Sequence, residues 1–344
     1  MHFLKKTLKD ILYTINKNSV SKLLYDQEIK KRSKLSLTDI IPLSKHINMF
    51  APFTNELQPV NDWYGHAKIL KKFLGLPESY QFKFNIEHGL YLSEQVAKIE
   101  LESNLPAFIT YSKYRTKVFK KLGRTAYAIG PFIQYAPHYL SKEQLKKERR
   151  RLGKTLLFFP AHSLIGLTTY YNVDWSYKKI AEIAKDFKTV RVCMYWKDVL
   201  LGKHKYYQNL GWECVTAGHI LDPSFLPRLK SIIYNSDLTI SNDASSPLSY
   251  SIYMNKPHII FYQQPEMSGQ GYLKKVVTDY WKSEPYNQVI KEFSKVQFRI
   301  TSKQRTLLNY YCGTNSINNK KELLRIIKDT EEIFKTYKRN EKKN

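Results

Sequence analysis

The sequence has little cysteine, and the spacing of its cysteines does not suggest pairs. Cys193, Cys214 and Cys312 are odd in number and form no CxxC motif. This pattern favours neither a disulfide framework nor a cysteine zinc site, and it fits a reducing compartment. We therefore expect a cytoplasmic protein.

Long apolar runs are also lacking. No segment reaches the roughly 18 apolar residues of a transmembrane helix, and Lys5, Lys6, Lys9 and Asp10 interrupt the N-terminal stretch that a signal peptide would need. We expect neither secretion nor a membrane span. The apolar residues between positions 4 and 15 recur at helical spacing, which predicts an amphipathic helix that either packs on its own domain or rests on an anionic bilayer.

Acidic residues are scarce relative to basic ones. The 344 residues include 56 Lys and Arg against 30 Asp and Glu, which gives a net charge of +26. Such a charge attracts polyanions over a long range, so the candidate partners are nucleic acids, anionic lipid headgroups and nucleotide-like substrates. The local basic runs, at 146–151 for example, are typical of solvated helix faces.

What the chain does contain is enough apolar sequence for two cores. Its length, with 42% hydrophobic and 14% aromatic residues, indicates two folded domains. Short apolar runs alternate with helical patterns, which predicts an α/β fold with parallel sheets. The expected strands lie in the runs 80–92, 105–112, 125–133, 155–163, 190–196, 212–218, 237–243 and 257–262.

A charged, helix-like connector divides these strands into two halves. We expect an N-terminal domain at 1–145, a C-terminal domain at 146–315, and a basic C-terminal helix and tail at 316–344. The second half has the cleaner strand rhythm and predicts a doubly wound domain. Ligands of such domains bind at the carboxyl ends of the strands.

One such strand end carries a pair of serines. In the segment SNDASSPLSYSIYMNKPHIIFY, which spans 241–262, Ser245 and Ser246 follow a strand and begin the next helix. The N–H groups at a helix N-terminus bind anions, and serine hydroxyls add donors, so a phosphate would fit here. The alternative is that one of these serines, or Asp243, simply caps the helix.

This segment resembles the serine-pair segment of CDP-glycerol glycerophosphotransferases, and bacterial sialyl-, polysialyl- and Kdo-transferases carry a comparable pair. The resemblance implies that Ser245 and Ser246 contact the phosphate of a cytidine nucleotide donor. The stretch NIEHGLYL resembles the first-domain loop in which the residue before a glycine acts as a base. That resemblance assigns the base to His88, with Glu87 beside it.

The resemblance also implies a GT-B-like fold, in which two doubly wound domains face each other across a cleft. The chain departs from these families in one respect, because MYWKDVLLG stands where they place a His-Pro pair. Either Lys197 or His162 then replaces that histidine at the phosphate. The donor-binding residues that we expect are Ser245, Ser246, Asp243, His162, Ser163, Lys197, His219 and Glu266. The cleft residues that we expect are Gly89, Gly130 and Pro131.

Together these features predict a metal-independent glycosyltransferase. A neutral histidine suits the removal of an acceptor proton, and the absence of any Asp-x-Asp motif gives no sign of a metal or another cofactor. We expect a nucleotide-activated donor, CMP-sugar above others, and a glycan or lipid-linked acceptor of a bacterial surface at the anionic inner face of the cytoplasmic membrane. The alternatives are a CDP-polyol phosphotransferase of a teichoic-acid-like polymer, a non-catalytic scaffold and a basic nucleic-acid binder. No nucleic-acid-binding motif supports the last of these.

Overall fold

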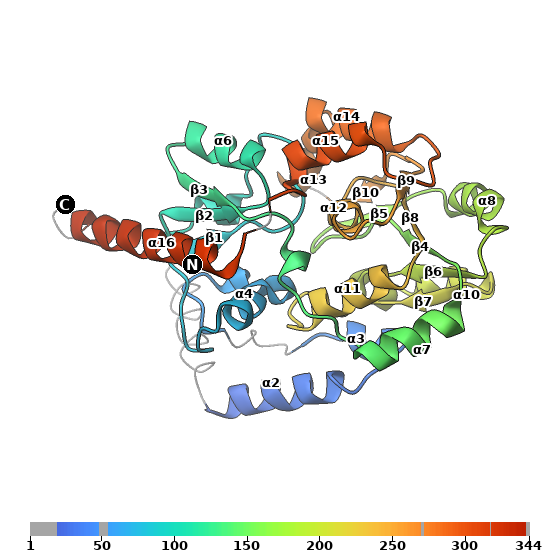
Figure 1. The fold of residues 1–344 in the computed structure, drawn as a ribbon, viewed down its shortest axis with the longest axis horizontal. Helices are drawn as coiled ribbons and strands as arrows, with labels where there is room; N and C mark the ends of the chain where they lie inside the picture. The colour runs from blue at the N-terminus through green and yellow to red at the C-terminus, as the bar shows by residue number, and fades with distance from the viewer. Residues whose placement is uncertain (1–18, 48–53, 270–271, 317, 342–344) are drawn as a thin grey trace.

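The computed structural model describes residues 19–47, 54–269, 272–316 and 318–341, and within them two parallel sheets organise the chain (Figure 1). We call residues 54–140 and 318–341 the first lobe, and residues 19–47 and 141–316 the second lobe. The first sheet has the order β1-β2-β3 and the second the order β7-β6-β4-β8-β9. The predicted α/β class with parallel sheets is confirmed.

The strands of both sheets are short. Those of the first sheet are β1 (Phe84–Ile86), β2 (Ala107–Thr110) and β3 (Thr125–Ala128). Those of the second are β4 (Thr155–Phe159), β6 (Thr189–Cys193), β7 (Glu213–Val215), β8 (Leu238–Ser241) and β9 (His258–Ile260). β4 and β8 are buried along their whole length, as expected for parallel strands that are covered on both faces. A separate antiparallel pair joins β5 (Thr168–Tyr170) to β10 (Glu266–Ser268).

Helices cover both sheets. The first lobe contains α4 (His66–Leu74), α5 (Lys98–Leu101), α6 (Lys113–Lys121) and α16 (Lys320–Glu341), with short 3-10 turns at Pro59–Gly65 and Phe132–Gln134. The second lobe contains α2 (Ser19–Arg32), α3 (Ile40–Ser44), α7 (Lys142–Leu152), α8 (Val173–Ala184), α9 (Trp196–Leu200), α10 (His204–Asn209), α11 (Phe225–Tyr234), α12 (Ser246–Tyr253), α13 (Tyr272–Trp281), α14 (Glu284–Phe293) and α15 (Ser302–Cys312). The predicted boundary between 145 and 146 falls inside α7.

The second sheet is doubly wound. Numbered along its own five strands, its order is third, second, first, fourth and fifth, so the direction of winding reverses between β4 and β8. Ligands of such sheets bind outside the carboxyl ends of the strands at this reversal. The three strands of the first sheet follow chain order without a reversal. The second sheet therefore offers the more favourable position for a ligand.

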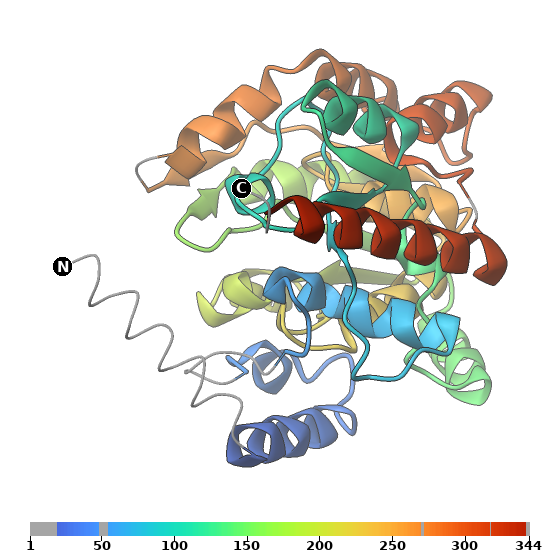
Figure 2. The same cartoon turned by 90° about the vertical axis from the view of Figure 1, so that its left-hand side faces the viewer.

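Each end of the described chain packs on the sheet that is more distant from it in the sequence. After α2, the N–H of Thr216 donates to the carbonyl of Leu37 at 3.1 Å, so this segment lies on the second lobe. At the other end, α16 lies along the first sheet (Figures 1 and 2) and buries Leu323, Ile326 and Ile327 there. Helix α16 lies within the range 316–344, and its apolar face packs inside the protein.

The two lobes share apolar cores. Leu90 and Val118 of the first lobe belong to the same buried cluster as Leu248 of the second. The hydroxyls of Tyr111 and Tyr250, one from each lobe, lie 2.7 Å apart in a buried hydrogen bond. The lobes are therefore joined by packing as well as by the chain.

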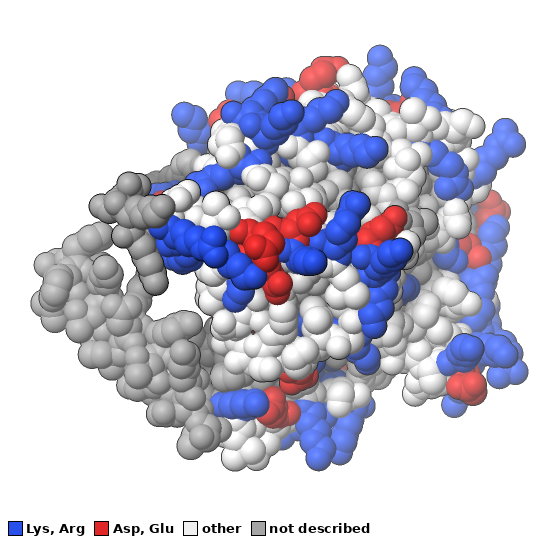
Figure 3. Space-filling model, turned by 60° about the vertical axis from the view of Figure 1, so that its left-hand side comes forward, with Lys and Arg blue, Asp and Glu red and all other residues white. Residues whose placement is uncertain are grey.

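The surface carries its charge diffusely. Figure 3 shows Lys and Arg side chains spread over the visible face, with Asp and Glu side chains among them at its middle and near its edges. Within the described residues, no helix combines the length and the apolar character needed to cross a membrane. The amphipathic helix predicted between positions 4 and 15 lies outside the described residues.

Candidate functional site

Two loops meet where the strand order of the second sheet reverses. The neighbouring strands β4 and β8 lead into residues 160–163 and 242–245. The N–H of Ala161 donates to Oδ1 of Asn242 at 2.6 Å and ties the two loops together. The serine pair and the His162 loop, which were selected from different parts of the sequence, are therefore neighbours at the expected ligand position.

The serine pair begins α12 without capping it. Ser245 occupies the N-cap position with an extended backbone, at φ −143° and ψ 177°, and its side chain makes no capping hydrogen bond. Ser246 is the first residue of the helix, and both serines are half-buried. The interpretation of Ser245 as an ordinary helix cap is therefore wrong. Its hydroxyl is not used for capping and lies at the positive end of the helix dipole.

Asp243 braces the loop in front of the serine pair. Its Oδ1 accepts hydrogen bonds from the hydroxyl of Tyr286 at 2.5 Å and from the N–H of Ala244 at 2.7 Å. Burial raises the pKa of the Asp243 carboxyl to about 6. With this oxygen engaged, Asp243 orders the loop that carries Ser245 and Ser246.

The loop after β1 reaches the serine pair from the first lobe. Gly89 has φ of +88°, a backbone conformation that favours glycine, and a Cβ placed on it would lie 3.9 Å from Oγ of Ser246. His88 immediately precedes this glycine. The structure thus brings the loop selected for a base next to the loop selected for a phosphate.

The His88 side chain is half-buried and uncharged. Its Nε2 is buried and has no hydrogen-bond partner among the described residues. Burial lowers the pKa of His88 to about 3, so the ring is neutral at pH 7. A neutral imidazole with an unoccupied nitrogen can accept a proton from a ligand.

A buried ion pair lies beneath His88. Nε of Arg115 donates to Oε1 of Glu87 at 2.8 Å, and the same guanidinium donates to two carbonyls of the following loop. Glu100 completes the group, because its Oε1 accepts a hydrogen bond from the backbone N–H of His88 at 3.4 Å. Burial raises the pKa of Glu87, despite the neighbouring arginine. Glu87 is fully buried here and fixes the shape of the loop through Arg115.

On the β4 side, His162 and Ser163 have different surroundings. The ring of His162 packs on Tyr195 with 4.2 Å between centroids, and burial lowers its pKa. Oγ of Ser163 donates to Oδ1 of Asp198 at 2.7 Å, and Lys203 forms an ion pair with the same carboxylate at 2.6 Å. Ser163 is therefore held in a buried network that supports the loop, and His162 is the member of the pair that stays a candidate for donor contact.

Lys197 does not occupy the phosphate-binding position expected of it. Its Nζ donates to the carbonyls of Leu164 and Leu167 and so closes the loop after β4. An ammonium group with these partners is drawn toward the backbone. Of the two replacements considered for the missing His-Pro histidine, His162 is the one that the geometry favours.

His219 and Glu266 also lie apart from the serine pair. The ring of His219 is buried against Trp196 at 4.4 Å between centroids, and the backbone N–H of His219 donates to the carbonyl of Leu43 in the N-terminal segment. Glu266 begins the exposed strand β10. The structure gives neither residue a contact with the other candidate donor-binding residues.

Gly130 and Pro131 are buried beneath the segment that connects α15 to α16. A Cβ placed on Gly130 would lie 2.3 Å from the carbonyl oxygen of Ser316, and its φ is +76°. The backbone that leads from α15 to α16 therefore fills the space that these residues were expected to open as a cleft floor. Their role is to let two backbone segments cross closely.

Sequence reasoning missed the turn WYGH at 63–66. Tyr64 has φ of +57°, which is uncommon for a residue other than glycine and occurs often at functional turns. Its N–H donates to the carbonyl of Ile220 at 2.6 Å, and its hydroxyl lies 3.5 Å from that of Tyr195. This turn thus links the two lobes between His88 and His162. The available signal was a glycine next to aromatic residues and a histidine.

His66, in the same turn, was missed as well. Its ring stacks between Phe132, at 4.2 Å between centroids, and His88, at 5.2 Å. Both ring nitrogens are buried without a partner among the described residues, and burial holds the pKa of His66 well below its ordinary value. His66 therefore fixes the plane of the His88 ring.

Comparison of the sequence with known families and with curated proteins finds no match. Solved structures with a similar fold include the wall teichoic acid polymerase TagF, at 16% identity and a TM-score of 0.35 over 67% of this chain. A TagF variant with a histidine replaced by alanine gives 14% identity and a TM-score of 0.40 over 75% of this chain and 69% of that one. This chain spans 58% of the length of the first TagF chain.

A plant enzyme is a further structural neighbour. A UDP-glucosyltransferase from Polygonum tinctorium, solved in complex with 3,4-dichloroaniline, aligns at 10% identity and a TM-score of 0.26 over 68% of this chain and 49% of that chain. These likenesses concern the fold. Within the described residues, no group of three or more His, Cys, Asp or Glu side chains is arranged to hold a metal ion.

Proposed function

We propose that the protein is a glycosyltransferase that moves a sugar from a nucleotide-activated donor to a hydroxyl group of a glycan or glycolipid. The observation that carries this proposal is the approach of Gly89 to Oγ of Ser246. It sets the loop of His88, whose Nε2 has no partner among the described residues, beside two hydroxyls at the start of a helix, which is where a doubly wound domain binds ligands. An anion site and a base on opposite lobes are the two parts that such a transfer needs.

The proposed chemistry uses the chain's own groups. Nε2 of His88 takes the proton of the acceptor hydroxyl, the acceptor oxygen forms a bond to the anomeric carbon, and the bond from that carbon to the donor phosphate oxygen breaks. Ser245, Ser246 and the N-terminus of α12 hold the departing phosphate. The same phosphate stabilises protonated His88, so the pKa of this residue rises when the donor binds.

The donor favoured by this proposal is a CMP-sugar, and no metal takes part in the step. One phosphate group suits a single helix N-terminus with two serines, and His162 lies on the adjoining loop as a further contact. The preference for cytidine follows the family resemblance of the serine-pair segment.

Two variants test these roles. Release of CMP from CMP-linked sugars, measured with EDTA present, should fall about a hundredfold or more in His88→Gln, because proton transfer by a positioned side chain contributes that much. Ser245→Ala combined with Ser246→Ala should weaken CMP binding about tenfold through the loss of hydrogen bonds to a charged group. Calorimetry and a turnover assay give the two quantities.

Matched controls separate these roles from general damage. His46→Gln changes an exposed histidine, and Ser302→Ala changes a serine that begins a different helix, α15. Both controls should behave like the parent protein. Full turnover in His88→Gln, or a CMP affinity that is unchanged in the Ser245→Ala and Ser246→Ala double variant, would overturn the proposal. Turnover of CDP-glycerol in place of CMP-sugars would assign phosphopolyol transfer instead.

We also propose that the protein works while attached to the anionic inner face of the cytoplasmic membrane. The net charge of +26 favours such a surface, and Leu23 and Leu24 on α2 are 56% and 57% exposed. Sedimentation with anionic vesicles should carry the protein down at low salt and release it at high salt. Leu23→Ser with Leu24→Ser should weaken this binding, while the exposed control Val296→Ser should not. Equal binding to neutral vesicles would contradict the proposal.

A further inference from the structure

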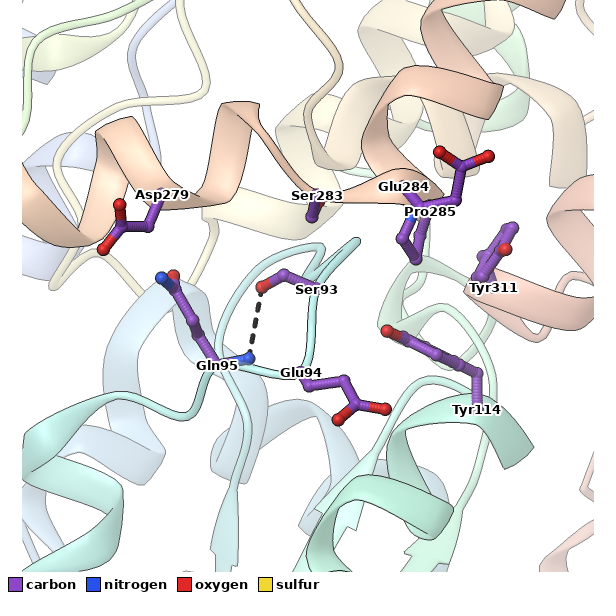
Figure 4. Close-up of a pocket in the computed structure, with 9 residues that line it drawn as sticks. All are labelled: Ser93, Glu94, Gln95, Tyr114, Asp279, Ser283, Glu284, Pro285 and Tyr311. Carbon is purple, nitrogen blue, oxygen red and sulfur yellow. Dashed lines mark hydrogen bonds between the residues drawn. The ribbon is translucent and has the colours of Figure 1, made fainter.

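A cavity of about 670 Å³ opens between the lobes, away from the residues selected by sequence (Figure 4). The loop after β1, α6, the end of α13, the start of α14 and α15 contribute to its wall. The lining residues are Ser93, Glu94, Gln95, Tyr114, Asp279, Ser283, Glu284, Pro285 and Tyr311.

The lining combines aromatic rings with hydrogen-bonding groups. The rings of Tyr114 and Tyr311 meet edge to face, with 5.1 Å between centroids and 83° between planes. In Figure 4, Glu94 extends toward Tyr114 and the amide of Gln95 lies near Asp279. Carboxylates and amides bind hydroxyl groups, while aromatic rings pack on apolar C–H surfaces. A saccharide presents both kinds of surface.

The charge of this wall restricts the ligand further. Glu94, Asp279 and Glu284 place three exposed carboxylates on the cavity, of which Glu94 pairs with Lys121, and their net negative charge disfavours phosphates and carboxylates as ligands. The chain as a whole carries +26, which repels cationic molecules over a longer range. An uncharged, hydroxyl-rich molecule avoids both penalties.

The cavity is connected to the serine pair and to His88. At the start of α14, Oγ of Ser283 donates to the carbonyl of Leu92 at 2.6 Å, and one turn later the hydroxyl of Tyr286 donates to Asp243 in the serine-pair loop. Four residues of chain separate His88 from Ser93, and the five steps between them span at most about 18 Å. The cavity and the proposed base therefore lie on one loop, no farther apart than the length of a short oligosaccharide.

We propose that this cavity binds an uncharged saccharide segment of the acceptor, whose terminal hydroxyl reaches His88. This inference rests on the proposed glycosyl transfer and names its acceptor class as a neutral glycan. It excludes a polyanionic phosphopolyol chain from this part of the protein, because such a chain would bring its phosphates against three carboxylates.

The test is direct binding without any donor. Saturation-transfer NMR on the full chain should show binding of uncharged tri- and tetrasaccharides from a panel built of glucose, galactose and N-acetylhexosamines, and weaker binding of their sulfated forms. Glu94→Gln combined with Glu284→Gln changes two exposed side chains and should weaken the neutral saccharides about tenfold. The control Glu182→Gln changes an exposed glutamate that, like Glu94, pairs with a lysine.

Three results would overturn the inference: no binding by any neutral saccharide, binding unchanged in the double variant, or sulfated forms that bind as tightly as neutral ones. Because donor and turnover are absent from this measurement, its outcome is independent of the transferase proposal. If saccharides do not bind at the cavity, the dependence of CMP binding on Ser245 and Ser246 is unaffected. Failure of CMP binding leaves saccharide binding measurable.

Discussion

The side-chain carboxyl of Glu100 is buried next to the loop that carries His88. Burial, together with the nearby charge of Glu87, raises its pKa from an ordinary 4.5 to about 8. The folded protein therefore keeps this proton between those two pH values, while the unfolded chain releases it. It follows that the contribution of Glu100 to stability is present below pH 4.5 and is lost as the pH rises to 8.

Replacing this carboxyl should reverse that loss. Glu100→Gln retains an oxygen for the His88 N–H and cannot ionise. We expect urea unfolding to show similar stability for variant and parent at pH 4.5, and a variant more stable by up to about 5 kcal/mol at pH 8.5. Glu102→Gln, an exposed change at the end of the same short helix, should show no such divergence. Parallel pH profiles for Glu100→Gln and the parent would refute this account.

Individual site residues were predictable from the sequence to different degrees. His88 and the serine pair could be selected because each follows a strand, and the fold gathers strand ends at one edge of a sheet. Their proximity now supports their proposed roles, which stay predictions. Lys197 and His219 could not be judged in the same way, because a loop carbonyl and the distant N-terminal segment decide where their side chains point.

Among the elements, α16 is a basic helix that nevertheless packs one of its faces into the protein interior. Ile327 is 7% exposed and packs in the core that contains Leu70, Leu74 and Phe82, whereas Leu324 on the same helix is 38% exposed. Ile327→Ala should lower the free energy of unfolding by about 2–4 kcal/mol. Leu324→Ala should cost less than about 1 kcal/mol. Urea midpoints measure both, and equal losses would mean that α16 is not docked as described.

The strands of the second sheet were recoverable from the sequence, and the pair formed by β5 and β10 was not. Each parallel strand is an apolar run of a few residues between turn signals, which a period-two or continuous apolar pattern reveals. β5 and β10 are three residues each, largely polar or exposed, and depend on pairing between segments about a hundred residues apart. Local pattern carries no information about such a pairing.

For the molecule as a whole, buried histidines set the response to acid. Burial lowers the pKa of His66, His88, His219 and His258. Below an ordinary histidine pKa of 6.5 the unfolded chain gains protons that the folded chain cannot, so stability is retained above pH 6.5 and is lost as the pH falls toward 3. Each such histidine contributes up to about 1.4 kcal/mol per pH unit.

A single substitution tests this acid response. His66→Phe keeps the stacked ring and removes two buried nitrogens that lack partners. The variant should be at least as stable as the parent at pH 7.5, and its loss of stability between pH 6 and pH 4.5 should be shallower by about 1.4 kcal/mol per pH unit. Urea titrations at several pH values measure the slope. An unchanged slope in His66→Phe would contradict the prediction.

The exchange of chain ends between the lobes governs how the protein can be divided. A cut near residue 145 would leave the N-terminal fragment without α16 and the C-terminal fragment without α2 and α3. Each fragment would expose the apolar surface on which a helix of the other fragment packs in the intact protein. Two fragments made this way should be insoluble when expressed singly and should become soluble when they are expressed together, each supplying the cover that its counterpart lacks.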